Sequence, residues 1–225
     1  MSIKDEIMRS LKSEILTLQL KPGTILSETA LSERFQISRT PLRDVLKQLS
    51  LESYIDIYPK KGNLVSYIDL ESVEQIIYLR SVLEREIIKY LSSHLLLTGV
   101  HELKEILDKQ LAVIHEDEGG ERFMNLDDAF HQSLFRLAGR EFLWNLIQQS
   151  NVHYARYRRL HMLRKEKLVE LHQEHSTILE LMMNQELDQL DELIHHHLRE
   201  DINSMYLQKN FSEYIQASKQ RSDLA

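Results

Sequence analysis

The apolar positions in the first 50 residues follow the period of an α-helix. Those of residues 3–19 recur at steps of three or four: Ile3, Ile7, Leu11, Ile15 and Leu18. This spacing places them on one face and predicts an amphipathic helix. Ser27 and Ser38 each stand where an N-cap begins a helix, and the turn QIS separates the two segments. The sequence thus predicts three helices, the last two joined by a three-residue turn.

The pattern changes to a period of two after residue 53. Residues 54–58 (YIDIY) and 63–67 (NLVSY) alternate between apolar and polar side chains. The segment PKKG between them contains a Pro and a Gly, which are suited to a turn. Alternation of this kind predicts two strands paired as a hairpin. We therefore expect residues 1–68 to form a compact domain of three helices and a β-hairpin.

The rest of the chain shows only helical periodicity as far as about residue 207. Turn-forming and charged segments divide it into six predicted helices: 72–93, 100–115, 121–138, 141–163, 166–183 and 187–207. Short connections between helices of this length are typical of an antiparallel bundle. The predicted fold class is therefore mainly α, with a domain of residues 1–68, an all-helical domain of 69–210 and a polar tail of 211–225.

Composition and charge narrow the class of protein. The 225-residue chain contains no cysteine, which excludes disulfides and thiolate metal sites, and its first ten residues lack the apolar run of a signal peptide. No stretch is apolar enough to span a membrane, so we expect a cytoplasmic protein. Residues 1–70 contain 10 Lys and Arg against 9 Asp and Glu, whereas the remainder contains 18 against 26. This difference indicates two units with different partners.

A cationic stripe stands out on the third predicted helix. Arg39, Arg43 and Lys47 are four residues apart, opposite the apolar phase of the same helix. Two short helices joined by a tight turn, the second with basic residues at its start, are typical of a helix-turn-helix that enters the DNA major groove. Ser38 and Thr40 add hydroxyl donors there. At the hairpin tip, Lys60, Lys61 and Gly62 suit a wing that approaches DNA closely.

Residues 15–65 resemble the winged helix-turn-helix of the GntR family of bacterial transcription regulators. The resemblance rests on the PG turn, on SRTPLRD and on the PKKG wing. It implies DNA contacts by a set of five residues: Ser38, Arg39, Thr40, Arg43 and Gly62. This sequence has Thr29 where some members have a further DNA-contacting arginine, and Ser53 where a glycine is frequent.

Three histidines and one aspartate of the helical region are in phase with its apolar faces. Asp127 and His131 are one turn apart, and His175 and His197 continue apolar stripes of their own helices. His195 and His196, by contrast, are expected to face solvent. A single buried histidine is more often a hydrogen-bonded core residue than a ligand. Four such groups together favour a divalent transition metal such as Zn, Ni or Mn, because burying them without a common partner is costly.

The same region resembles the FCD effector domain of the FadR-like GntR subfamily. The resemblance rests on RSVLE, DDAFH, EHSTIL and a final HL. It implies that Asp127, His131, His175 and His197 are metal ligands and that a small organic acid binds beside the metal. Cationic side chains should then line the pocket, and the candidate effector-binding residues are Arg80, Glu84, Arg156 and Arg159.

The sequence therefore predicts a ligand-responsive regulator, with repression the leading hypothesis, that binds a palindromic DNA operator as a homodimer. A second reading is a metal sensor, in which the ion itself is the signal. The third is a helical metalloenzyme. A ferritin-like di-iron protein needs two Glu-x-x-His pairs, and the only pair here, Glu192 with His195, is out of phase with the core. We therefore do not expect an enzyme.

Overall fold

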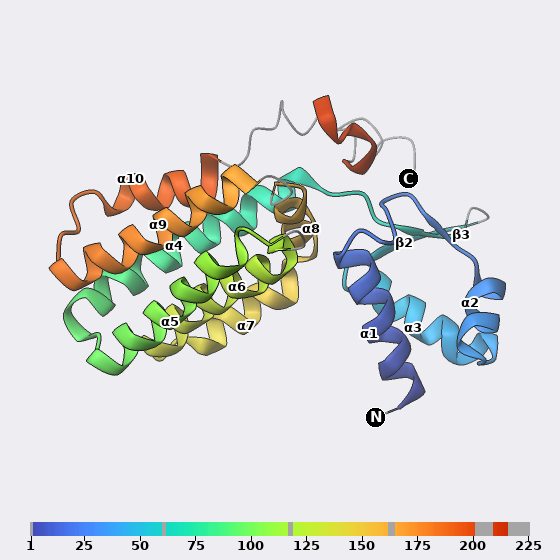
Figure 1. Ribbon diagram of the computed structural model, residues 1–225. Coiled ribbons are helices and arrows are strands. Elements are labelled where there is room, and N and C mark those ends of the chain that lie inside the picture. The colour runs from blue at the N-terminus through green and yellow to red at the C-terminus, as the bar shows by residue number, and fades with distance from the viewer. Residues whose placement is uncertain (1, 60–61, 117–118, 162–164, 201–208, 216–225) are drawn as a thin grey trace. The chain divides into compact units, whose positions relative to one another are not determined.

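The computed structural model describes residues 2–59, 62–116, 119–161, 165–200 and 209–215. The chain divides into two compact units (Figure 1). The first comprises Met1–Val73, Gln149–Tyr157 and Asn203–Ala225, and the second comprises Glu74–Gln148 and Arg158–Ile202. The sequence-based boundaries after residues 68 and 210 remain predictions.

The first unit contains the three predicted helices and a small antiparallel sheet. Its helices are α1 (Ile3–Leu16), α2 (Glu28–Phe35) and α3 (Arg39–Leu51). Its strands are β1 (Ile25–Leu26), β2 (Ile55–Tyr58) and β3 (Gly62–Val65), in the order β1-β3-β2. The predicted hairpin is present, with Tyr58 paired to Gly62. The two-residue strand β1 was not predicted, because a segment so short has no periodicity to detect.

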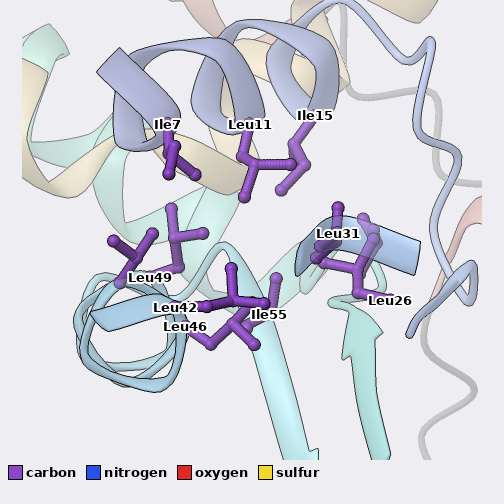
Figure 2. Packing of buried hydrophobic residues seen from close by; sticks show 11 residues of the cluster. Ile7, Leu11, Ile15, Leu26, Leu31, Leu42, Leu46, Leu49 and Ile55 are labelled. Carbon is purple, nitrogen blue, oxygen red and sulfur yellow. The ribbon is translucent and has the colours of Figure 1, made fainter. Parts of the chain in front are cut away.

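One apolar core holds the helices of this unit on the sheet. Figure 2 shows Ile7, Leu11 and Ile15 projecting from one face of α1 toward residues of α3 and the strands. The partner residues include Leu42, Leu46, Leu49 and Ile55. Burying one such side chain contributes roughly 1.5–3 kcal/mol. The apolar residues of α3 thus hold this helix against the core, and its opposite face is exposed to solvent.

The turn between α2 and α3 depends on two polar residues. Gln36 ends α2 in the left-handed region, with φ 51°. Ser38 occupies the N-cap position of α3 in an extended conformation, but its side chain makes no capping hydrogen bond. The first amides of α3 therefore lack a side-chain cap at the exposed start of the helix, which is the part expected to meet DNA.

The second unit is the predicted helical bundle. It is built from α4 (Leu70–His94, which starts in the first unit), α5 (Leu97–Val113), α6 (Gly119–Leu137), α7 (Glu141–Ser150), α9 (Lys165–Asn184) and α10 (Leu190–His195). Helix α5 packs against α6 and α9, and α9 also packs against α10 (Figure 1). An apolar cluster that includes Val113, Phe123 and Leu168 joins α5, α6 and α9.

Two of the predicted helices differ from the structure. The segment 141–163 is not continuous, because buried Asn151 separates α7 from α8 (Val152–His161), and α8 contributes residues to both units. The helix predicted for 187–207 starts at Leu190 and becomes a π-helix over His196–Glu200. His197 and Leu198 are both buried in this π-helix.

The tail contains some regular structure. Ser212–Tyr214 form a 3-10 turn, and Ile215 makes a parallel bridge to Ile68 within the first unit. None of the helices in the described ranges is long and apolar enough to cross a membrane.

Candidate metal centre and DNA-binding surface

Four side chains from three helical segments of the second unit meet in its interior. Helix α6 supplies Asp127 and His131, α9 supplies His175 and the π-helix supplies His197. All four are buried. One ring nitrogen of each histidine lies within 4.8 Å of the other two. The Nε2 atoms of His131 and His197 are 3.2 Å apart, and Asp127 Oδ1 is 3.5 Å from His175 Nε2. The structure thus brings together all four predicted ligands.

The other nitrogen of each ring faces an acceptor. His197 Nδ1 is 2.7 Å from Glu174 Oε2, and His175 Nδ1 is 3.1 Å from Gln110 Oε1. His131 Nδ1 lies 2.8 Å from Glu84 Oε2. An acceptor at Nδ1 favours the tautomer with its proton there. Each Nε2 atom then carries a lone pair that a cation can bind.

The arrangement fits a divalent transition metal. Buried His175 Nε2 has no hydrogen-bond partner among the described residues. Converging lone pairs and a carboxylate repel one another unless a cation lies between them, and burying such atoms unpaired is costly. Imidazole with one carboxylate is a donor set for Zn, Ni or Mn. The outer carboxylates and the amide orient the rings, as the outer contacts of metal-binding histidines commonly do.

The electrostatics keep Glu84 and Asp127 ionised and favour the neutral forms of His131 and His175. Burial would raise the pKa of Glu84, but the positive charge of Arg80 and the contact with His131 outweigh it and lower the pKa to about 2. Burial likewise opposes ionisation of Asp127, but the charge of Arg158 outweighs it and lowers the pKa well below its usual value. Burial lowers the pKa of His131 and of His175. Neutral imidazole and ionised carboxylate are the forms that bind metal.

Arg158 is a functional candidate that the sequence analysis missed. Its guanidinium donates to Asp127 Oδ2 and, at 2.7 Å, to Asp128 Oδ1. Arg158 follows buried Tyr154 by one turn, so its phase pointed inward. We predicted one continuous helix over 141–163, and the buried positions of such a helix differ from those of α8, which begins separately at Val152.

The four predicted effector residues occupy three different environments. Arg80 donates through Nε to Glu84 Oε1 at 2.6 Å and lies over the ring of Trp144. Glu84 also contacts His131, so this pair lies beside the histidines. Their role toward an effector remains a prediction. Arg159 instead donates to exposed Glu121 at 3.1 Å.

Arg156 has a structural role in the first unit. Its guanidinium donates to the backbone carbonyl of Ser66 at 2.6 Å and to Ser66 Oγ at 3.0 Å. The side chain is fully buried there. Arg158 is thus the arginine of this segment that reaches the histidine and aspartate cluster, whereas effector binding by Arg156 and Arg159 remains a prediction.

His195 and His196 were both expected to face solvent, and only one of them does so fully. His195 is exposed, as predicted. His196 is only partly exposed, and its Nδ1 lies 2.6 Å from Glu174 Oε1. Glu174 therefore contacts His196 with one oxygen and His197 with the other.

The cationic stripe lies on the exposed face of α3. Arg39, Arg43 and Lys47 are exposed, whereas Leu42, Val45, Leu46 and Leu49 on the other face are buried. Arg43 donates to Glu28 at 2.9 Å, and Arg39 donates to Thr29 Oγ1 at 3.2 Å. Both partners lie on α2, so the two helices present one polar surface. Ser38 and Thr40 are exposed at its edge.

The predicted wing tip is described in part. Gly62 begins β3 with φ 95°, a conformation that side-chain-bearing residues rarely adopt, and no atom lies within 4 Å of the position a Cβ would take. Glycine is thus required there by the backbone and not by packing. Lys60 and Lys61 lie outside the described residues.

Two regions of the chain each match a known protein family. Residues 3–65 match bacterial regulatory proteins of the gntR family, and residues 75–200 match the FCD domain. A similar protein is the HTH-type transcriptional repressor RspR of Escherichia coli K12, 27% identical over 88% of this chain and 86% of that protein. An HTH-type transcriptional regulator in an unstable DNA locus of Streptomyces ambofaciens is 36% identical, over 69% of this chain and 64% of its own length.

Solved structures share the fold. The E. coli protein McbR/YncC superposes with a TM-score of 0.70 at 20% identity, covering 93% of this chain and all of that one. A GntR regulator from Rhodococcus sp. RHA1 gives a TM-score of 0.64 at 18% identity, over 95% of this chain and 98% of its own. The families and relatives are transcriptional regulators and not enzymes. The chain therefore belongs to the GntR family of bacterial transcriptional regulators, with a GntR-type helix-turn-helix domain followed by an FCD domain.

Proposed function

We propose that the protein represses transcription as a homodimer, and that a small organic acid bound at a metal in the second unit changes its affinity for a palindromic operator. The observation that carries the proposal is the convergence of Asp127, His131, His175 and His197 in one buried centre. The chain also carries a DNA-binding surface on its first unit. A metal centre in the same chain can therefore serve to regulate DNA binding.

The centre suits a ligand that completes a coordination shell. A divalent ion held by these four residues would supply open coordination positions for a carboxylate, because an octahedral ion has more positions than four protein ligands occupy. Glu84, Gln110 and Glu174 would fix the three rings. Arg80 and Arg158 would supply positive charge beside a bound acid.

The DNA-binding part of the proposal rests on helix α3. Its exposed arginines suit guanine edges and phosphates, and helix-turn-helix proteins commonly bind two half-sites as dimers. Two relatives, RspR and the gluconate operon repressor of Bacillus subtilis, are named as repressors, which favours repression here. The acid acts by binding one dimer geometry more tightly than another, which shifts the population between them.

Fluorescence anisotropy with a labelled duplex tests the proposal. The duplex is first selected from a random library by the metal-loaded protein. Acetate, lactate, gluconate, succinate and citrate are then added to metal-loaded and to chelated protein. We expect at least one acid to change DNA affinity by about fivefold or more, and only in the metal-loaded protein. An acid effect of equal size after chelation contradicts the proposal.

Metal sensing is the second candidate. It is favoured by the contact of Arg158 with Asp127, since an ion that binds Asp127 competes for the partner of Arg158 and changes the interior without any acid. In the same titration, a change in DNA affinity on adding metal, together with no response to any acid, identifies this function instead.

A further inference from the structure

The segment Phe211–Ile215, near the C-terminus, lies in the first unit against the linker of residues 66–69, which joins β3 to α4. Ile68 of this linker donates its amide to the carbonyl of Tyr214 at 2.8 Å. Ile68 also forms a parallel bridge with Ile215. Ile68 is fully buried and Ile215 is 9% exposed. A segment from the far end of the chain therefore binds the linker as a short added strand binds a sheet edge.

Aromatic contacts support this backbone pairing. The ammonium of Lys21 lies over the ring of Tyr214, 6.0 Å from its centre. The ring of Phe211 meets the same ring edge to face, with the ring centres 6.0 Å apart. Cation–π and edge-to-face contacts are favourable at such distances. These contacts offset part of the conformational entropy that the end of a chain loses when it is held in place.

The linker is held at two further points by α8. Arg156 donates to the carbonyl of Ser66 at 2.6 Å, and the amide of Asp69 donates to Nδ1 of His153 at 3.2 Å. Ile68 lies between these two points in the sequence, and its amide is bound by the C-terminal segment. The segment Phe211–Ile215 thus completes a set of contacts that fixes the linker along its length.

Helix α4 runs from the linker into the second unit, so the linker determines how freely the recognition helix α3 can move relative to the rest of the chain. Resting on the proposed homodimer, we propose that Phe211–Ile215 is a clamp that fixes this linker and so holds the two recognition helices at the spacing of two half-sites. Binding to the second half-site gains from effective concentration, and this gain falls when the connection becomes flexible. Binding to one half-site does not depend on the spacing.

Two truncations test the inference. One ends the chain after Gln208 and removes the clamp, and the control ends it after Ile215 and keeps the clamp. Fluorescence anisotropy measures the affinity for the selected duplex with both half-sites and for a duplex with one. We expect the truncation after Gln208 to weaken binding to the two half-sites by about 5- to 10-fold and to leave binding to one half-site unchanged. The control should match the wild type on both duplexes.

A point variant and hydrogen exchange test the clamp itself. Ile215→Asp should release the segment, because a carboxylate is disfavoured at this buried position. Glu213→Gln, an exposed change in the same segment, is its control. Mass spectrometry of the peptide that contains Ile68 should show faster amide exchange in Ile215→Asp and in the truncation after Gln208. Both controls should exchange at the rate of the wild type.

The outcomes separate the clamp from the function on which it rests. An equal loss of affinity for both duplexes overturns the inference, because the segment then only stabilises the first unit. Unchanged or tighter binding to the two half-sites overturns it as well, and so does unchanged exchange at Ile68. If the wild type binds one half-site as tightly as two, the proposed homodimer fails. The exchange experiment then decides by itself whether the segment holds the linker.

Discussion

His197 Nε2 lies 3.2 Å from His131 Nε2, although the opposite nitrogen of each ring faces a carboxylate. If both rings carry their proton on Nδ1, two lone pairs confront each other inside the bundle. A cation between them turns this repulsion into coordination, and Glu84 and Glu174 then serve to aim the rings.

Glu174→Gln should weaken metal binding because it removes the negative charge that orients His197 and increases its basicity. We expect zinc affinity to fall about 10- to 100-fold, the usual cost of losing such an outer contact. Competition titration with a chromophoric chelator measures it. Glu180→Gln, an exposed change on the same helix, is the control and should leave the affinity unchanged. Equal affinities in the two variants would show that the orientation of His197 does not depend on Glu174.

Arg43 and Glu28 form an ion pair on the surface expected to meet DNA. Glu28→Ala should therefore strengthen DNA binding by about two- to fivefold, because an exposed pair of about 0.2–1 kcal/mol no longer competes for the arginine. Arg43→Ala should weaken binding and reduce the slope of log affinity against log salt by about 1. Anisotropy titrations at several salt concentrations measure both. An unchanged slope in Arg43→Ala would exclude a phosphate contact by this residue.

Arg156→Ala should destabilise the first unit without affecting the metal centre. The substitution leaves the buried carbonyl of Ser66 without its charged donor, which costs about 2–3 kcal/mol. Urea unfolding followed by circular dichroism measures the loss. Arg159→Ala, which removes a surface contact, should stay within about 0.5 kcal/mol of the wild type. Altered zinc affinity in Arg156→Ala would contradict a role of this residue confined to the first unit.

The ion pair between Glu14 and Arg34 connects α1 to α2. We expect it to make the stability of the first unit depend on pH. The hydrogen bonds from Arg34 lower the pKa of Glu14 below its ordinary value of 4.5. The folded state therefore binds this proton less readily than the unfolded state does. The stability that the pair adds is present above pH 4.5 and is lost as the pH falls below that value. Glu14→Gln should show a smaller loss of stability than wild type between pH 6 and pH 3.5, and exposed Glu6→Gln should not.

The sequence predicted most of the fold because its apolar spacing is regular. Leu42, Val45, Leu46 and Leu49 identified both the buried face of α3 and, by exclusion, its exposed basic face. The inward phase of His131, His175 and His197 was visible for the same reason. Spacing does not reveal where a helix breaks without Gly or Pro, and this explains the errors at Asn151 and at the π-helix.

The polar contacts around the centre could not be read from the sequence. Gln110 and Glu174 contact the histidines from other segments, and no local pattern encodes such a pairing. Arg156, Arg158 and Arg159 are neighbours in sequence but have three different partners. Only the packing of α8 decides which of them reaches Asp127.

Metal stoichiometry tests the central claim most directly. The full chain is incubated with zinc, nickel or manganese, desalted, and analysed by inductively coupled plasma mass spectrometry beside His175→Ala and His195→Ala. Since His175 is a buried member of the centre and His195 is exposed on the adjacent helix, we expect one ion per chain in the wild type and in His195→Ala. His175→Ala should lose it. Retention of the ion by folded His175→Ala, or its absence from the wild type with all three metals, would contradict a metal centre at Asp127, His131, His175 and His197.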